Sequence, residues 1–198
     1  TYFWREHEQF LYLKEHVFPQ MARWEADSRD WHIWCAASST GEEPYTLAML
    51  CMDYLGLDYP NWDTQVLATD IDTHVLDIAR KGIYTKDSVE HLPHTYVRRF
   101  FRNYSDKEYQ VTKELKEQVL FRQFNLMNPL PFSRPLHVVF LRNVMIYFEE
   151  ETKLRLLNQI YDKLMPGGYL FIGSTESINQ NHGKFEYIKP SVYRKPLY

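Results

Sequence analysis

The chain has 198 residues, 44% of them hydrophobic and 25% charged, which is the composition of a single globular domain. No apolar run approaches the roughly 20 residues that a membrane helix needs, so no membrane insertion is predicted. The formal net charge of −3 argues against a surface devoted to nucleic acid, and we expect no nucleic-acid partner.

The cysteines and histidines predict no metal site. Cys35 and Cys51 lack C-x-x-C spacing, so we expect buried free thiols in a reducing, cytoplasmic compartment. His91 and His94 are separated by Pro93 and have no further ligand types nearby, which favours a surface position.

The first segment, 1–24, spaces apolar residues among charged ones at mixed helical intervals, which predicts one or two helices with a buried stripe. After a polar loop, an apolar strand over 32–37 runs into small residues at 38–41. Pro44 is predicted at the first position of the following helix, because its ring-fixed φ suits that position.

The turn after this strand is a candidate ligand site, because free backbone N–H groups collect where a strand of an open α/β sheet meets a helix. Its one glycine, Gly41, matches the dinucleotide pattern G-x-G-x-x-G poorly. Glu42 and Glu43 would repel a pyrophosphate at the helix start, which favours a cationic or zwitterionic ligand. S-adenosylmethionine fits, having a sulfonium, an ammonium and a ribose but no phosphate. An ordinary turn with solvated glutamates is the alternative.

The helix after the turn is predicted to end at Gly56, and a second apolar strand, 65–72, then finishes in acidic residues. Such folds hold ribose hydroxyls with an acidic side chain at the end of this strand. We therefore assign Asp70 to the ligand and Asp72 to the cap of the helix that begins at Thr73.

The alternating pattern breaks between 84 and 123. Two apolar segments, 109–112 and 118–121, flank a charged turn at 113–117, which predicts a hairpin. We expect a small inserted antiparallel subdomain over about 98–123.

Two later strands, like the first two, end next to polar positions, at Asn125 and Asn143. The carboxyl ends of parallel strands form the ligand crevice of an open sheet. Ala37, Asp70, Asn125 and Asn143 are therefore expected to converge on one edge.

The remaining pattern completes a doubly wound, mostly parallel α/β sheet. A strand is predicted over 136–144, a helix over 149–165, and final strands over 169–173 and 187–195.

Six motifs in this order closely resemble those of the CheR-type chemotaxis receptor methyltransferases, over essentially the whole chain. They are Thr1-x-Phe3-x-Arg5-Glu6, Ser39-Thr40-Gly41-Glu42-Glu43-Pro44-Tyr45, Ala68-Thr69-Asp70-Ile71-Asp72, Asn125-Leu126, Arg142-Asn143-Val144-Met145-Ile146-Tyr147-Phe148 and Gly173-Ser174-Thr175-Glu176. The resemblance implies a Rossmann-like class I methyltransferase domain over 1–198. It would transfer a methyl group from S-adenosylmethionine to glutamates of chemoreceptor methylation helices, leaving S-adenosylhomocysteine. We expect a cytoplasmic monomer.

The resemblance also implies residue roles. Glu43 would face the methionyl part of the cofactor and Asp70 the ribose, while Asn125 and Leu126 would flank the adenine. The other cofactor-binding positions predicted here are Thr1, Ala37, Gly41, Arg142 and Asn143.

Arg5 and Tyr147 match the pair that the family places beside the transferable methyl group, and Arg5 is also assigned to the cofactor. Without the resemblance, they would be interpreted as an exposed helix arginine and a core tyrosine.

Two features depart from the family pattern. Members usually carry a small helical N-terminal domain that helps to recognise the receptor, and we expect it to be absent because the chain begins at the first cofactor motif. Members that bind a receptor tether have glycines in the hairpin turn of the subdomain. The segment 113–117 has none, which resembles members without the tether.

Two other functions stay open: a non-catalytic S-adenosylmethionine-binding module, and a methyltransferase that acts on another carboxylate. The presence of both Arg5 and Tyr147 favours an enzyme. A glutamate acceptor needs no general base, because a carboxyl group with a pKa near 4.3 is already ionised at neutral pH.

Overall fold

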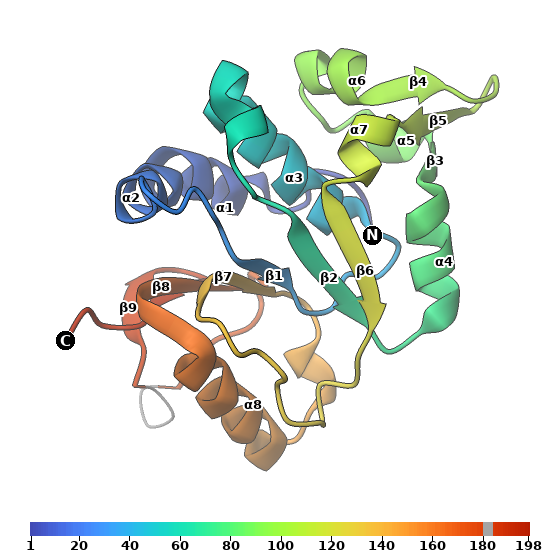
Figure 1. The fold of residues 1–198 in the computed structure, drawn as a ribbon. Coiled ribbons are helices and arrows are strands. Elements are labelled where there is room, and N and C mark those ends of the chain that lie inside the picture. The colour runs from blue at the N-terminus through green and yellow to red at the C-terminus, as the bar shows by residue number, and fades with distance from the viewer. Residues whose placement is uncertain (180–183) are drawn as a thin grey trace.

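A seven-stranded sheet forms the centre of the computed structural model, which describes residues 1–179 and 184–198 (Figure 1). The strand order is β6-β2-β1-β7-β8-β10-β9; the first five strands run parallel, and β10 pairs antiparallel with both β8 and β9. The strands are β1 (Ile33–Cys35), β2 (Val66–Asp70), β6 (Val119–Gln123), β7 (Leu136–Leu141), β8 (Leu164–Ile172), β9 (Glu186–Lys189) and β10 (Val192–Arg194).

Helices cover both faces of this sheet, as expected of a doubly wound fold (Figure 1). Those of the main layers are α1 (His7–Tyr12), a π-helical turn (Leu13–Val17), α2 (Phe18–Trp24), α3 (Glu42–Leu55), a 3-10 helix (Gly56–Asn61), α4 (Thr73–Lys81) and α8 (Glu150–Lys163). Shorter helices are α5 (Lys86–Val89), α6 (His94–Phe100), α7 (Lys113–Lys116) and a 3-10 turn (Met145–Tyr147). Every helix in the described ranges is too short or too polar to span a membrane.

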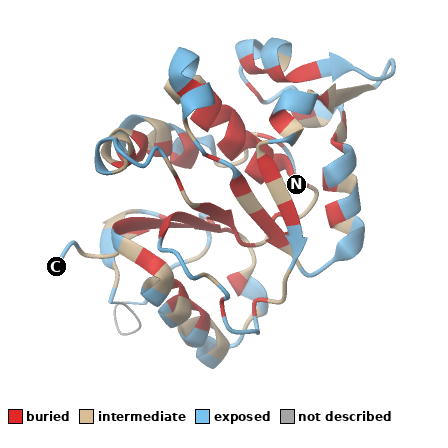
Figure 2. Ribbon diagram, in the orientation of Figure 1, coloured by how far each residue is buried: buried red, intermediate tan, exposed pale blue. Residues whose placement is uncertain are grey.

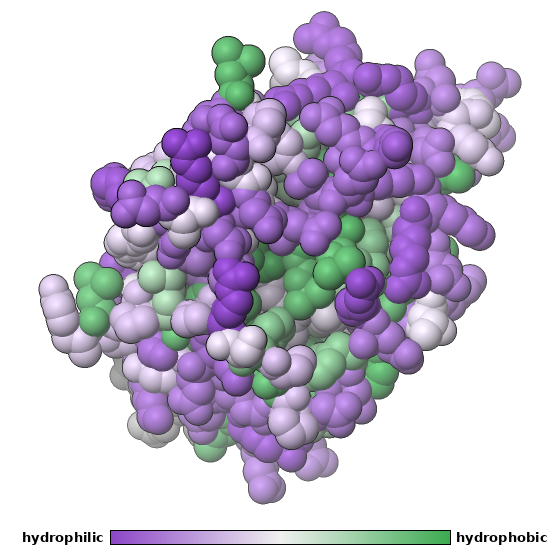
Figure 3. All heavy atoms as spheres, in the orientation of Figure 1, coloured by the Kyte–Doolittle hydropathy of each residue, from purple (hydrophilic) through white to green (hydrophobic). Residues whose placement is uncertain are grey.

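Side chains of the central strands alternate between two hydrophobic cores. Ile33 and Cys35 of β1 pack into the core beneath α1, α2 and α3, whereas Trp34 packs into the core beneath α8. A parallel sheet covered on both faces buries its central strands completely, which explains why all six residues of β7 are buried and five of them are apolar (Figure 2). Apolar side chains also gather over β2 and β6 on the face shown in Figure 3, surrounded by polar residues.

The strand order creates a switch point between β1 and β7. The chain moves from β1 outward through β2 to β6, and then returns to the other side of β1 to continue through β7 and β8. Open α/β sheets bind ligands at the carboxyl ends of the strands where the direction reverses in this way.

The predicted helix ends at Gly56 and Asp72 are confirmed. Gly56 follows the last residue of α3, and the Asp72 carboxylate accepts the backbone N–H of His74 at 2.8 Å, which caps α4. Cys35 and Cys51 are both buried free thiols, as expected.

The predicted hairpin over 109–121 is wrong. Residues 113–116 form α7, capped by Thr112, and β6 pairs in parallel with β2 of the main sheet. The small antiparallel sheet has the order β3-β5-β4, with β3 (Ile83–Thr85), β4 (Phe101–Asn103) and β5 (Glu108–Val111). Val119 and Phe121 of β6 are buried in the main sheet. A local apolar pattern predicts a strand but does not show whether it pairs with β2 or with the neighbouring β5.

The true turn of the antiparallel sheet joins β4 to β5 over residues 104–107. Tyr104-Ser105-Asp106-Lys107 contains no glycine, so the absence of glycine noted for 113–117 also holds for this turn.

Several element boundaries differ from the predictions; the predicted strand over 136–144, for example, ends at Leu141. Helix α3 begins at Glu42, so Pro44 is its third residue and not its first; a missing N–H costs no helical bond anywhere in the first turn. Helix α8 ends at Lys163, and β8 begins directly afterwards and includes Pro166. The predicted final strand over 187–195 is two strands, because Ser191 adopts φ 68° between them.

Acidification is expected to destabilise the fold through His137 of β7. Its Nδ1 accepts the backbone N–H of His32 at 2.9 Å, so its Nε2 carries the proton and donates to Glu25 at 2.8 Å. Burial lowers the pKa of His137 because it disfavours the charged imidazolium. The neutral, hydrogen-bonded imidazole therefore contributes to the free energy of unfolding above the unfolded-state pKa of about 6.5. This contribution is lost as the pH falls through the lower folded-state pKa. Urea unfolding at neutral and mildly acidic pH should show a smaller acid-induced loss for His137→Gln than for wild type. An equal loss in both proteins would contradict this assignment.

Candidate cofactor and active site

A cavity of about 430 Å³ opens at the carboxyl ends of β1, β2 and β7, which is the switch point of the sheet. Eight residues that the sequence analysis assigned to the site line it: Thr1, Arg5, Ala37, Glu43, Asp70, Arg142, Asn143 and Tyr147. The expected convergence therefore holds for Ala37, Asp70 and Asn143.

Gly41, Asn125 and Leu126 are not among the described lining residues. Asn125 accepts the backbone N–H of Met127 at 2.9 Å, and Leu126 is buried in the core beneath α8. Their assignments to the adenine stay predictions.

Gly41 serves the packing beside the cavity. It adopts φ 100°, and a Cβ at this position would lie 2.9 Å from the Ala79 Cβ and 2.7 Å from the Tyr84 hydroxyl oxygen. The absence of a side chain lets the turn approach α4 and β3 closely.

Asp70, the last residue of β2, shapes the turn that lines the cavity. Its carboxylate accepts the backbone N–H groups of Ser39 at 2.9 Å and Asp72 at 3.0 Å. The same side chain lies at the cavity wall, where a fold of this kind holds ribose hydroxyls.

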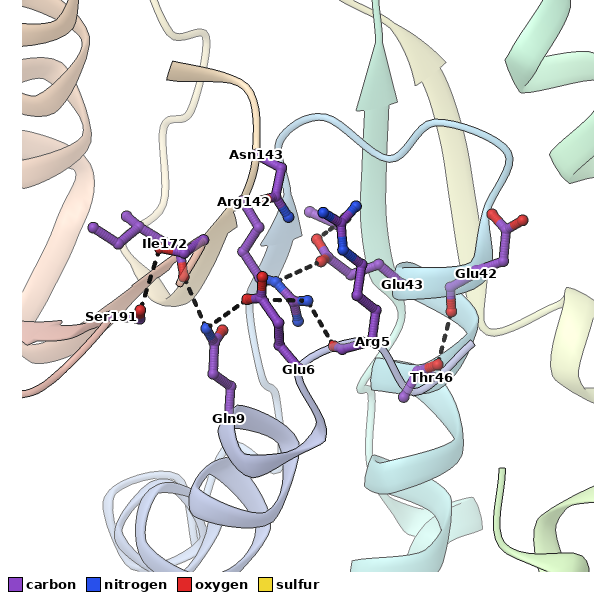
Figure 4. A network of polar contacts seen from close by, with 12 residues as sticks. Arg5, Glu6, Gln9, Glu42, Glu43, Thr46, Arg142, Asn143, Ile172 and Ser191 are labelled. Carbon is purple, nitrogen blue, oxygen red and sulfur yellow. Dashed lines mark hydrogen bonds and ion pairs between the residues drawn. The ribbon is translucent and has the colours of Figure 1, made fainter. Parts of the chain in front are cut away.

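Arg142, which follows β7, is the centre of a buried ionic network (Figure 4). Its side chain is 2% exposed; Nη2 donates to the backbone oxygen of Arg5 at 2.6 Å and lies 3.5 Å from Glu6 Oε2, and Nε lies 3.3 Å from Glu43 Oε2. The guanidinium also lies 5.1 Å from the ring centroid of Phe10. Nη1 is buried and has no hydrogen-bond partner within residues 1–179 and 184–198. An unpaired buried donor is costly, so this atom favours an anionic group of a ligand.

Glu43 lies on the other side of the network. Its carboxylate accepts the Cys35 thiol at 3.0 Å, and Figure 4 shows it directed toward Arg142, whereas Glu42 points away. Burial raises the pKa of Glu43, and the Arg142 guanidinium acts in the opposite direction. A carboxylate and an unsatisfied guanidinium donor in one cavity suit the ammonium and carboxylate of an amino-acid group, which is the methionyl end of S-adenosylmethionine.

Arg5 and Tyr147 also line the cavity. The Tyr147 side chain is 79% exposed, so its interpretation as a core tyrosine is wrong. The Arg5 guanidinium lies near the Glu43 carboxylate (Figure 4). Both side chains are available to an acceptor that enters from solvent.

The sequence analysis missed Trp4, Ser39 and Thr175, which also line the cavity. Trp4, Ser39 and Asn143 adopt positive φ values of 68°, 48° and 58°. Backbone conformations of this kind gather at functional sites. Only Asn143 carried a signal in the sequence, because asparagine tolerates the left-handed region better than most residues.

Asp70→Ala is expected to weaken binding of S-adenosylhomocysteine by about 10- to 100-fold, the equivalent of one charge-assisted hydrogen bond. The loss has two sources, the carboxylate at the cavity wall and its support of Ser39. Calorimetry gives the affinity, and Asp72→Ala is the control, because Asp72 caps α4 and is not among the lining residues described. Equal affinity in wild type and Asp70→Ala would remove Asp70 from the site.

The sheet order, the cavity at the switch point and the acidic end of β2 define an open α/β fold with a site suited to a ligand that carries a ribose. Residues 1–194 match the family described as "CheR methyltransferase, SAM binding domain". The chain belongs to the CheR methyltransferase family, and S-adenosylmethionine is its cofactor.

The chain is similar to chemotaxis protein methyltransferases over nearly its whole length. The chemotaxis protein methyltransferase of Borreliella burgdorferi is 38% identical over 198 residues, covering 98% of this chain and 70% of the relative. A probable chemotaxis protein methyltransferase of Rhizobium etli is 32% identical, with coverages of 98% and 74%. The chemotaxis protein methyltransferase of Escherichia coli is 36% identical over 197 residues, with coverages of 98% and 66%.

Proposed function

We propose that this protein methylates glutamate side chains of chemoreceptors, in the cytoplasm and during chemotactic adaptation, to form γ-glutamyl methyl esters. Its relatives carry the name chemotaxis protein methyltransferase, which supports a role in chemotaxis. The cavity supports the choice of a carboxylate as acceptor. In this proposal residues 1–198 form one catalytic domain, and the β3-β5-β4 sheet belongs to its inserted subdomain.

The observation that carries this proposal is the set of titratable groups around the cavity. Neither histidine nor cysteine is among the described lining residues. Glu43 is paired with Arg142 and accepts the Cys35 thiol, while Asp70 accepts two backbone N–H groups. The described lining residues therefore offer no histidine, no cysteine and no unpaired carboxylate as a general base, which favours an acceptor that is already ionised, such as a glutamate carboxylate.

When bound, S-adenosylmethionine supplies a methyl group on a positively charged sulfur: an acceptor oxygen forms the carbon–oxygen bond while the carbon–sulfur bond breaks and its electron pair stays on sulfur. Glu43, Arg142 and Asp70 hold the cofactor in this proposal. Arg5 and Tyr147 orient the acceptor carboxylate and displace water from it. Orientation supplies the acceleration, because tight binding of the carboxylate charge alone would stabilise only the ground state.

The test is transfer of a radiolabelled methyl group from S-adenosylmethionine to membranes that contain chemoreceptors. Label in the receptor band that is released as methanol by mild alkali would identify a methyl ester. Cofactor binding without transfer would instead indicate a non-catalytic module. Label that appears only on an added small carboxylic acid would indicate a different acceptor.

A further inference from the structure

Glu176, which follows β8, binds three backbone N–H groups with one carboxylate. Oε2 accepts from Asn143 at 2.9 Å and from Gly173 at 2.7 Å, and Oε1 accepts from Met145 at 2.9 Å. Asn143 and Met145 lie in the loop after β7, whereas Gly173 directly follows β8. The carboxylate therefore ties together the carboxyl ends of two neighbouring parallel strands.

The loop that Glu176 holds carries residues of the site. Arg142, Asn143 and Tyr147 all line the cavity, and Tyr147 ends the 3-10 turn that begins at Met145. Asn143 adopts φ 58°, which costs free energy and persists only where neighbouring contacts impose it. The hydrogen bonds from Asn143 and Met145 to Glu176 supply such contacts on both sides of Val144.

Gly173 makes this arrangement possible. A Cβ at Gly173 would lie 2.8 Å from Glu176 Oε2 and 2.5 Å from Asn143 Oδ1. A side chain at this position would push the carboxylate and the loop apart.

We propose that Glu176 is a positioning residue for the reaction: it holds the 142–147 loop in the conformation that presents Tyr147 to the acceptor. It does so through backbone N–H groups and without touching the substrate. The role of Glu176 in turnover rests on the proposed function. Its stabilisation of the 142–147 loop does not. Because carboxylate–amide hydrogen bonds are charge-assisted, the carboxamide of Glu176→Gln cannot replace them. Its NH₂ group would also face backbone donors.

The first measurement is hydrogen exchange of a peptide that covers 142–148, followed by mass spectrometry. Exchange of this peptide should be about 10- to 100-fold faster in Glu176→Gln than in wild type, the factor for one charge-assisted hydrogen bond. Peptides from the buried strands β1 and β7 should exchange as in wild type. Glu151→Gln removes a charge from an exposed position in the first turn of α8 and is the matched control. Unchanged exchange over 142–148 in Glu176→Gln would overturn the proposal.

The second measurement separates turnover from binding. At saturating cofactor, kcat for receptor methylation should fall by about tenfold or more in Glu176→Gln, while affinity for S-adenosylhomocysteine by calorimetry falls by a smaller factor, because Arg142 is also held by Arg5, Glu6 and Glu43. Gly173→Ala should reproduce this split, because its Cβ displaces the same carboxylate without removing it. Faster exchange with a wild-type kcat would overturn the positioning role. A wild-type protein without receptor methylation would refute the proposed function, and the exchange result would still decide whether Glu176 holds the loop.

Discussion

Arg142→Met is expected to weaken cofactor binding by more than about 100-fold and to lower the free energy of unfolding by about 3–5 kcal/mol. Methionine fills much of the same volume but leaves the Glu43 and Glu6 carboxylates without their shared cation. Removing one partner of a buried ion pair costs more than the pair itself contributes, because the remaining charge has lost its solvation. The variant also removes the Nη1 donor assigned to the cofactor carboxylate.

Calorimetry with S-adenosylhomocysteine and urea unfolding measure the two effects. Arg142→Lys should recover part of the stability and little of the affinity, since an ammonium cannot reproduce the planar contacts to Arg5, Glu6 and Glu43. Arg122→Met, at an exposed position of β6, controls for the loss of one positive charge. A stable Arg142→Met protein with wild-type affinity would show that the network is dispensable.

Tyr147→Phe is expected to lower kcat for receptor methylation by about 100-fold while leaving cofactor affinity within about threefold. The exposed hydroxyl group is assigned to the acceptor carboxylate, and an orientation error of about 1 Å can cost a factor of this size. The fold should be unaffected, because the side chain is 79% exposed.

Tyr104→Phe is the matched control, since Tyr104 is an exposed tyrosine in the β4–β5 turn, outside the cavity. Rates are compared with both cofactor and receptor saturating. Equal kcat values for wild type and Tyr147→Phe would remove Tyr147 from the reaction and leave Arg5 as the candidate for orientation.

The two glutamates after Gly41 show how far the sequence predicts the site. Their charge correctly excluded a dinucleotide loop, because that argument depends only on their place at a helix start. Which of them reaches the cavity depends on the rotation of α3 about its axis. The carboxylate of Glu42, the first residue of the helix, accepts a hydrogen bond from the Thr40 hydroxyl group. The carboxylate of the next residue, Glu43, lies against the Arg142 guanidinium. That rotation is set by the packing of α3 on the sheet.

Contacts between distant segments decided the rest of the site. Arg142 contacts the backbone of Arg5, 137 positions earlier, and Glu176 reaches back 33 positions to Asn143. The sequence shows each of these residues in a motif but not that they touch. Their contacts arise only after the strands have taken their places in the sheet.

The sequence by itself determined the parallel α/β class, the sheet edge at which the cavity opens, and the cap of α4 by Asp72. These follow from local rules, because burial on both faces makes a strand apolar and the carboxyl ends of parallel strands meet at one edge. Only the tertiary structure decided that β6 joins β2 and not β5, that Tyr147 is exposed, and that Arg142 is buried among carboxylates. The physical reason is that a strand's partner and a side chain's neighbours are chosen by the free energy of long-range packing. A local pattern of apolar residues is compatible with several such choices.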